Sequence, residues 1–170
     1  MLSVRPAAVD DAEAIVELTA AGWRSAYPGI VPDELIEDLP IAAWRHDVNT
    51  GLRAPVAEAF TRIAELHEEV AGYAYVAAPA RGEPEGARVA ELVAIYVHSE
   101  HWRAGVGRAL MESATAEAAR LGYEQMVLWT FEANARAQAF YRALGWQQDG
   151  AARPHQASGT PTVRMRRSLS

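Results

Sequence analysis

Residues 91–108 read ELVAIYVHSEHWRAGVGR and carry the clearest structural signals in the chain. Its first seven residues form a near-continuous apolar run headed by Glu91, which is typical of a strand covered on both faces at the centre of a sheet. A helix then begins at Gly105-Val106-Gly107 and continues at helical apolar spacing until Gly122 ends it. The apolar run at 126–131 predicts the next strand. A strand, a helix and a strand in this order predict a right-handed crossover between parallel strands.

The segments on either side complete an α/β pattern in what we expect to be a single domain of residues 1–170. Turn residues, helix caps and apolar periodicity mark the boundaries. Residues 41–57 show no clear assignment. The predicted strands are 2–5 at an edge, 60–66 and 70–78 as a hairpin, 91–97, 126–131, 146–148 and 162–166. The predicted helices are about 11–22, 33 to Pro40, 105–121, and one that Asn134 caps and Gly145 ends.

The composition excludes several functional classes. Half of the 170 residues are hydrophobic, and 16 basic against 22 acidic residues give a net charge of −6, which argues against a protein that mainly grips nucleic acid. There is no cysteine, so disulfides, Cys-ligated metal centres and a thiol nucleophile are excluded. No apolar run approaches the roughly 20 residues that cross a bilayer. With no signal-peptide pattern at the start, we expect a cytoplasmic protein without a membrane partner.

The helix start at 103–108, RAGVGR, has the properties of a diphosphate site. Glycines permit close backbone approach, and the unpaired N–H groups of a first helical turn attract anions. Arg103 and Arg108 add positive charge. The alternative is a Gly-x-Gly turn that only packs the helix against a strand. The segment lacks the Gly-Lys-Ser/Thr of a P-loop, and Leu110 replaces the third glycine of a dinucleotide fingerprint.

A second segment, 134–146 (NARAQAFYRALGW), resembles the C-terminal motif of the GNAT superfamily of acetyl-CoA-dependent N-acetyltransferases. The helix start resembles the partner motif of that family, Gln/Arg-x-x-Gly-x-Gly/Ala, with Gly105 and Gly107 in place. Trp102 stands at the Gln/Arg position, and Arg103 follows it. The resemblance implies an α/β fold with three layers: a mixed, mostly antiparallel sheet of about seven strands flanked by about four helices. It also implies a splay between the strands that end near Val97 and Phe131.

The resemblance further implies where acetyl-CoA binds as co-substrate. The pantetheine arm would lie in the splay and pair with the backbone of Ile95 and Val97, and the Val97 N–H would stabilise the developing oxyanion. The diphosphate would lie on residues 103–108, and Asn134 would contact the cofactor, cap its helix, or both. The implied cofactor-binding residues are Ile95, Tyr96, Val97, Arg103, Ala104, Gly105, Val106, Gly107, Arg108, Asn134, Ala137 and Tyr141.

Two residues are candidates for proton transfer. Tyr141 matches the family tyrosine near the coenzyme sulfur, where a phenol can protonate the departing thiolate. Its alternative role is packing in the core. Glu91 lies fourteen residues before Gly105, where the histone-acetylating branch of the family has its general base, and burial would raise its pKa. The alternatives are a structural glutamate or an ordered-water path for the proton.

Other polar and aromatic residues have competing interpretations. Trp23 and Tyr27 resemble the acceptor wall of the family, or they pack a small lid. His98 and His101 have metal-ligand spacing, but surface histidines fit better, and we expect no metal. RNA contact is one interpretation of the C-terminal arginines, among them Arg164. Alternation along an edge strand explains them better.

These observations predict an enzyme that transfers acetyl from acetyl-CoA to a primary amine of a small molecule or peptide. The absence of cysteine favours direct attack in a ternary complex. The alternatives are a longer acyl group, a protein N-terminus as acceptor, a non-catalytic acyl-CoA sensor, or a methyltransferase with Glu132 on its nucleoside. The motif at 134–146 disfavours the methyltransferase. A homodimer is common in the family and is possible here.

Overall fold

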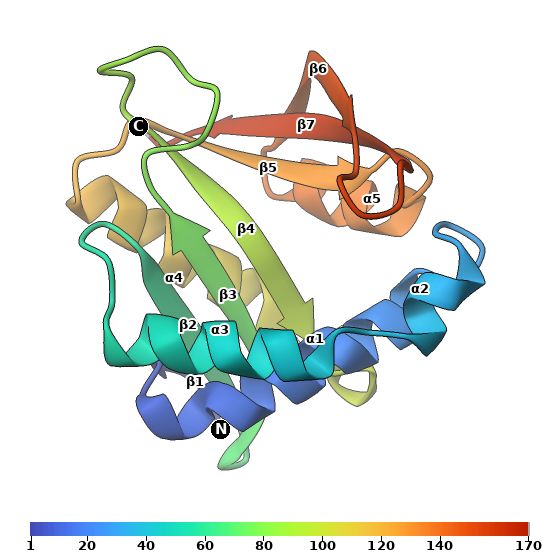
Figure 1. Ribbon diagram of the computed structural model, residues 1–170. Coiled ribbons are helices and arrows are strands. Elements are labelled where there is room, and N and C mark those ends of the chain that lie inside the picture. Colours follow the sequence, from blue (N-terminus) through green and yellow to red (C-terminus); the bar gives the residue numbers. More distant parts are fainter. Residues whose placement is uncertain (170) are drawn as a thin grey trace.

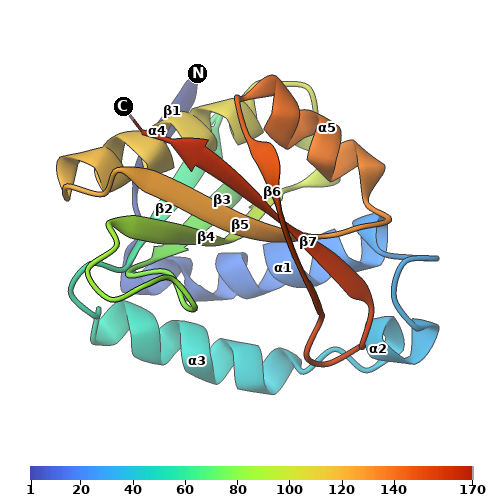
Figure 2. The ribbon, with the colours of Figure 1, turned by 90° about the horizontal axis from the view of Figure 1, so that it is seen from above.

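The computed structural model describes residues 1–169 and shows a seven-stranded sheet with helices on both faces (Figures 1 and 2). The strand order is β1-β2-β3-β4-β5-β7-β6. The strands are β1 (Leu2–Pro6), β2 (Phe60–Leu66), β3 (Glu69–Ala77), β4 (Val89–Val97), β5 (Gln125–Phe131), β6 (Gln147–Pro154) and β7 (Pro161–Ser168). The α-helices are α1 (Ala12–Ala26), α2 (Asp33–Glu37), α3 (Ile41–Arg53), α4 (Val106–Arg120) and α5 (Ala135–Ala143). Short 3-10 turns occupy Val9–Asp11 and Ser99–His101.

Each face of the sheet has its own hydrophobic cluster. Helices α4 and α5 lie on one side in the view from above, and α1 and α3 lie on the other (Figure 2). The apolar stripe of α4, including Val106 and Leu110, is fully buried against the strands. On the opposite face, Ile15 and Leu18 of α1 pack against Tyr73 of β3. None of the helices within residues 1–169 has the length and apolarity that spanning a bilayer requires.

The central strands part as expected. Strands β4 and β5 pair in parallel only from Val89↔Gln125 to Leu92↔Leu128, so the predicted parallel crossover through α4 is confirmed. Beyond that point β4 pairs with β3 alone and β5 with β7 alone. The two strands therefore diverge toward Val97 and Phe131, which confirms the splay (Figure 1).

One expectation for β4 is wrong. The strand was expected to be covered on both faces, but Val93 is 49% exposed. The cause is a register shift: Tyr75 pairs with Ala94 while Val76 pairs with Leu92, which leaves Val93 as an extra, bulged residue. The bulge lies just where β4 separates from β5, so it opens surface at the base of the splay.

Helix α3 was not predicted, and it raises the number of α-helices from about four to five. Its apolar residues Ile41, Trp44, Val48 and Leu52 recur at helical spacing but are only partly buried. They face α1 in an outer layer and not the sheet, and Val48 and Leu52 join the cluster around Ile15 and Leu18. A stripe this sparse, interrupted by Asp47, Asn49 and Gly51, gives a weak signal in the sequence.

Strand β7 is not the edge strand that its alternating arginines indicated. It lies between β5 and β6, and β6 forms the edge. The other edge prediction is confirmed, because β1 pairs with β2 alone. The predicted hairpin is also confirmed: β2 and β3 join through His67 and Glu68, both with positive φ, as tight two-residue turns require.

Candidate active site

The N-terminus of α4 presents unpaired backbone N–H groups beside the splay. Gly105 is the N-cap, with a φ of +84°, and the first intrahelical bond runs from Ala109 N to Gly105 O. The N–H groups of the three residues between them precede that bond and have no helical partner. Such groups, together with the helix dipole, bind anions. Residues 103–108 thus have the local geometry expected of a diphosphate site.

Gly107 serves packing as well. A Cβ at this position would lie 3.2 Å from Phe140 Cζ and 3.7 Å from Val97 Cγ2. Glycine therefore allows α4 to approach both α5 and the end of β4. The Gly-x-Gly pattern here supports an anion site and a close helix contact at the same time.

Trp102, which replaces the family's Gln/Arg, links three elements at this site. Its indole Nε1 donates a hydrogen bond to Val97 O at 2.9 Å, so the loop is held to the end of β4. The guanidinium carbon of Arg136, from α5, lies 3.8 Å from the centre of the Trp102 ring. Arg136 was not among the predicted site residues. The sequence signal for Arg136 was the tryptophan at the Gln/Arg position of the motif, because an aromatic ring there can stack with a cation.

Tyr27, Tyr73 and Tyr96 lie close together on the face of the sheet that α1 covers. Tyr96 of β4 and Tyr27 at the end of α1 have their hydroxyl oxygens 3.3 Å apart. A Cβ at Gly22 would lie 2.2 Å from Tyr96 Cδ1, so glycine leaves the space for that ring. Burial raises the pKa of Tyr96, and the nearby phenols of Tyr27, Tyr73 and Tyr141 raise it further. Tyr96, which the resemblance predicts to bind the cofactor, therefore also brings its side chain close to Tyr27.

Tyr141 lies in α5, where its ring centre is 5.4 Å from that of Phe140 and 6.3 Å from that of Trp146. Burial raises the pKa of its phenol well above the ordinary value, and the neighbouring Tyr27 adds to the effect. The hydroxyl is therefore protonated throughout the neutral range. Asn134 caps the same helix, with Oδ1 accepting from Ala137 N at 3.1 Å, so the helix-cap role is present.

Glu91 lies at the base of the splay, paired across the sheet with Ala77 on one side and Val127 on the other. Burial raises its pKa. The positive charges of Arg153, Arg81 and Arg164 oppose that rise, as does a hydrogen bond from the backbone of Arg81. Glu91 is therefore a partly buried carboxylate surrounded by arginines, five residues along β4 from Tyr96.

The two predicted acceptor residues belong to a larger aromatic group. Tyr27 contacts Trp23 edge to face at 5.0 Å between ring centres and Phe131 at 4.9 Å. His155, in the β6–β7 connection, lies 5.2 Å from Phe131 and 5.9 Å from Trp23. Trp44 of α3 adds a further ring 6.0 Å from Trp23. The group connects the ends of α1 and β5. Trp44, Phe131 and His155 were not predicted for the acceptor site, because residues this far apart in sequence meet only in the fold.

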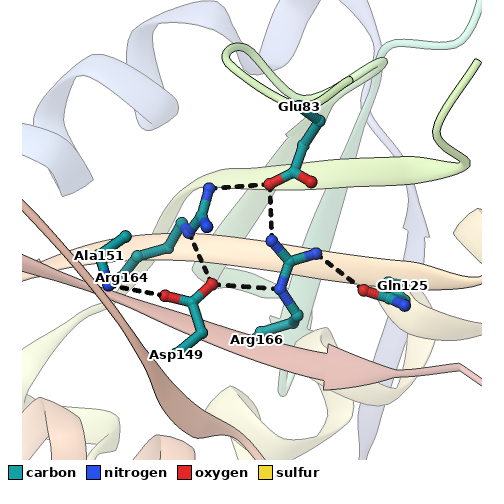
Figure 3. A network of polar contacts seen from close by, with 6 residues as sticks. All are labelled: Glu83, Gln125, Asp149, Ala151, Arg164 and Arg166. Carbon is teal, nitrogen blue, oxygen red and sulfur yellow. Dashed lines mark hydrogen bonds and ion pairs between the residues drawn. The ribbon is translucent and has the colours of Figure 1, made fainter. Parts of the chain in front are cut away.

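The paired histidines and the C-terminal arginines make contacts of different kinds. His98 and His101 have their ring centres 5.9 Å apart, and no group of three possible metal ligands occurs in residues 1–169. Arg164 and Arg166 each contact both Glu83 and Asp149, at 2.6–3.1 Å (Figure 3). Those arginines are neutralised by partners in the chain.

Comparison with known proteins places this geometry in one family. Residues 14–146 match the model of the acetyltransferase (GNAT) family. The chain is 29% identical over 147 residues to an uncharacterised N-acetyltransferase, YuaI, of Bacillus subtilis (strain 168), covering 84% of this chain and 79% of that protein.

Solved structures show the same fold. The PaiA N-acetyltransferase of Thermoplasma acidophilum, in complex with coenzyme A, superposes with a TM-score of 0.81 at 17% identity, covering 99% of both chains. The ribosomal-protein-S18-alanine N-acetyltransferase of Escherichia coli gives 0.70 at 18% identity, covering all of this chain and 95% of that one. The matched family, the splayed sheet and the glycine-capped α4 together establish that this chain belongs to the GNAT family of N-acetyltransferases.

Proposed function

We propose that the protein transfers an acetyl group from acetyl-CoA to a primary amine of a small molecule or peptide, by direct attack in a ternary complex. The observation that carries the proposal is the position of the α4 N-terminus beside the gap where β4 and β5 part. That gap leaves the backbone of β4 beyond Leu92 unpaired on its β5 side, where an extended amide-containing arm can bind as a strand does.

In this mechanism the amine nitrogen attacks the thioester carbonyl carbon, and the C–S bond then breaks. The N–H of Val97 donates to the developing oxyanion. Tyr141, protonated because burial raises its pKa, donates a proton to the leaving thiolate. The proton of the amine passes to Glu91, directly or through an ordered water; the raised pKa of Glu91 suits that role.

Calorimetric titration with acetyl-CoA, beside nicotinamide dinucleotides and S-adenosylmethionine, tests the proposal first. We expect micromolar binding of acetyl-CoA alone, followed by amine-dependent release of free thiol. Binding without thiol release across a broad amine panel would favour an acyl-CoA sensor. Absence of acetyl-CoA binding would refute the proposed function.

The proposal also covers the class of acceptor, the location of the protein, and its domain and oligomeric organisation. The charge of −6 supports a small-molecule or peptide acceptor over a nucleic acid. A charged donor such as acetyl-CoA does not cross membranes unaided, which supports a cytoplasmic location. We also propose that the chain forms one domain; light scattering would decide between a monomer and the homodimer that the family suggests.

A further inference from the structure

Arg153 of β6 is held in a defined place on the acceptor side of the sheet. Its guanidinium carbon lies 3.9 Å from the centre of the Trp129 ring. Trp129 is the β5 residue directly after Leu128, where β5 separates from β4. Stacking on an indole restricts a guanidinium to one region while its N–H groups stay free to bind. Arg153 also lines an open hollow of about 220 Å³, so a solute can reach it.

The charge of Arg153 differs from that of its neighbours in having no partner. Arg164 and Arg166, on the adjacent strand, are each paired with Glu83 and Asp149 in the network of Figure 3. Arg153 makes no ion pair with any residue from 1 to 169, and its side chain is exposed. The network neutralises Arg164 and Arg166, whereas the positive charge of Arg153 stays open to solvent in a hollow that Glu132 also lines.

That charge adjoins the groups proposed to handle the acceptor. Trp129 and Arg153 each precede a member of the aromatic group by two residues, and those members, Phe131 and His155, have ring centres 5.2 Å apart. The charge of Arg153 also acts on the candidate base Glu91. An acceptor whose amine approaches the splay therefore brings its substituents near Arg153. A cationic substituent would be repelled there, whereas a carboxylate matches the planar N–H pair of the guanidinium.

We propose that the acceptor is a primary amine bearing a carboxylate or a similar anionic group, and that Arg153 binds this group. The inference rests on the proposed function and adds the substrate class. The acidic side chains of α2, Asp33, Glu34 and Glu37, favour the competing class, a cationic polyamine. None of these carboxylates pairs with Arg153 within residues 1–169, whereas Arg153 is fixed by its stack on Trp129.

The test measures thiol release from acetyl-CoA with amines that differ only in the anionic group. Suitable pairs are L-phenylalanine with phenethylamine and L-methionine with 3-(methylthio)propylamine. The phosphonate analogue of phenylalanine separates carboxylate from phosphonate recognition, and spermidine represents the cationic class. Wild type is compared with Arg153→Gln, with Arg153→Lys, and with Arg53→Gln. The last is a control that removes the same charge from an exposed position at the end of α3.

We expect the anionic member of each pair to have a kcat/KM at least tenfold higher in wild type and in Arg53→Gln. In Arg153→Gln the value for that member should fall about tenfold to a hundredfold, through KM of the amine, with the KM for acetyl-CoA unchanged. Arg153→Lys should be intermediate, because it keeps the charge and loses the planar fork. The KM of the decarboxylated amines should be unaffected by either substitution. Arg153→Gln also removes a charge that lowers the pKa of Glu91, and because both members of a pair share that change, their ratio isolates the anionic group.

Equal use of both members of each pair, preference for spermidine, or an anionic preference that persists in Arg153→Gln would overturn the inference. So would a wild-type enzyme that binds acetyl-CoA and acetylates none of the anionic amines. Failure of wild type to bind acetyl-CoA is a different result, because it refutes the proposed function itself.

Discussion

At the scale of single residues, Tyr141 can be tested without knowing the natural acceptor. Tyr141→Phe removes the proton donor and keeps the ring that contacts Phe140 and Trp146. We expect kcat to fall about 10²-fold, while the Kd for acetyl-CoA stays within twofold. Stopped-flow or steady-state thiol release measures the first and calorimetry the second. Full turnover by the variant at every pH would remove Tyr141 from the mechanism.

The proposed role of Glu91 predicts how kcat/KM depends on pH. A general base must be deprotonated, so kcat/KM should fall as pH drops through the pKa of Glu91, which burial raises above that of an ordinary glutamate. Glu91→Gln should lower kcat about 10²-fold and abolish this acidic limb. Glu124→Gln, at an exposed position, is the matched control. A limb that persists unchanged in Glu91→Gln would assign the base to another group or to water.

At the scale of elements, the β4–α4 loop and α5 meet through Trp102 and Arg136. Because Trp102 stands in place of the Gln/Arg of the family motif, the guanidinium of Arg136 stacks there and adds its charge to those of Arg103 and Arg108. We predict that Arg136 contacts a phosphate of the coenzyme, so Arg136→Gln should raise the Kd for acetyl-CoA about tenfold and weaken its dependence on salt.

Two further variants separate charge from packing at this junction. Trp102→Phe keeps a ring for Arg136 but loses the hydrogen bond to Val97 O, so its effect on Kd should be smaller. Arg142→Gln removes a charge from the other end of α5 and serves as control. Identical affinities in wild type, Arg136→Gln and Arg142→Gln would show that Arg136 only packs.

Elements differ in how far sequence predicted them. The β4–α4–β5 unit was predicted because each part carries its own signal: a continuous apolar run, glycines at both helix ends, and a second apolar run. Helix α3 was missed because its four spaced apolar residues bury themselves against α1 only in the folded chain. The bulge at Val93 leaves no mark in the sequence, because any residue of the run could have been the extra one.

At the scale of the whole molecule, the network of Figure 3 joins the β3–β4 connection to β7 and β6. Glu83 is 10% exposed at its side chain and accepts from both Arg164 and Arg166. Glu83→Gln leaves two partly buried guanidinium groups with less compensation. The free energy of unfolding should fall by about 1–3 kcal/mol, and Tm by several degrees for a domain of this size.

Thermal and urea unfolding of Glu83→Gln measure this loss, with Glu85→Gln, two residues away and exposed, as control. An unchanged Tm would show that the network contributes no net stability, which is the usual result for fully exposed ion pairs.

The family, the order of most elements and the position of the glycine-capped helix start could be read from the sequence, because these depend on local signals along the chain. The sequence also identified Glu91, Tyr141 and the residues around Gly105 as candidates. Only the tertiary structure brought Trp44, Phe131 and His155 onto Trp23 and Tyr27, placed Arg136 on Trp102, and separated the paired Arg164 from the unpaired Arg153. The physical reason is distance along the chain. Contacts between residues far apart in sequence depend on register, bulges and helix packing, which no local pattern encodes.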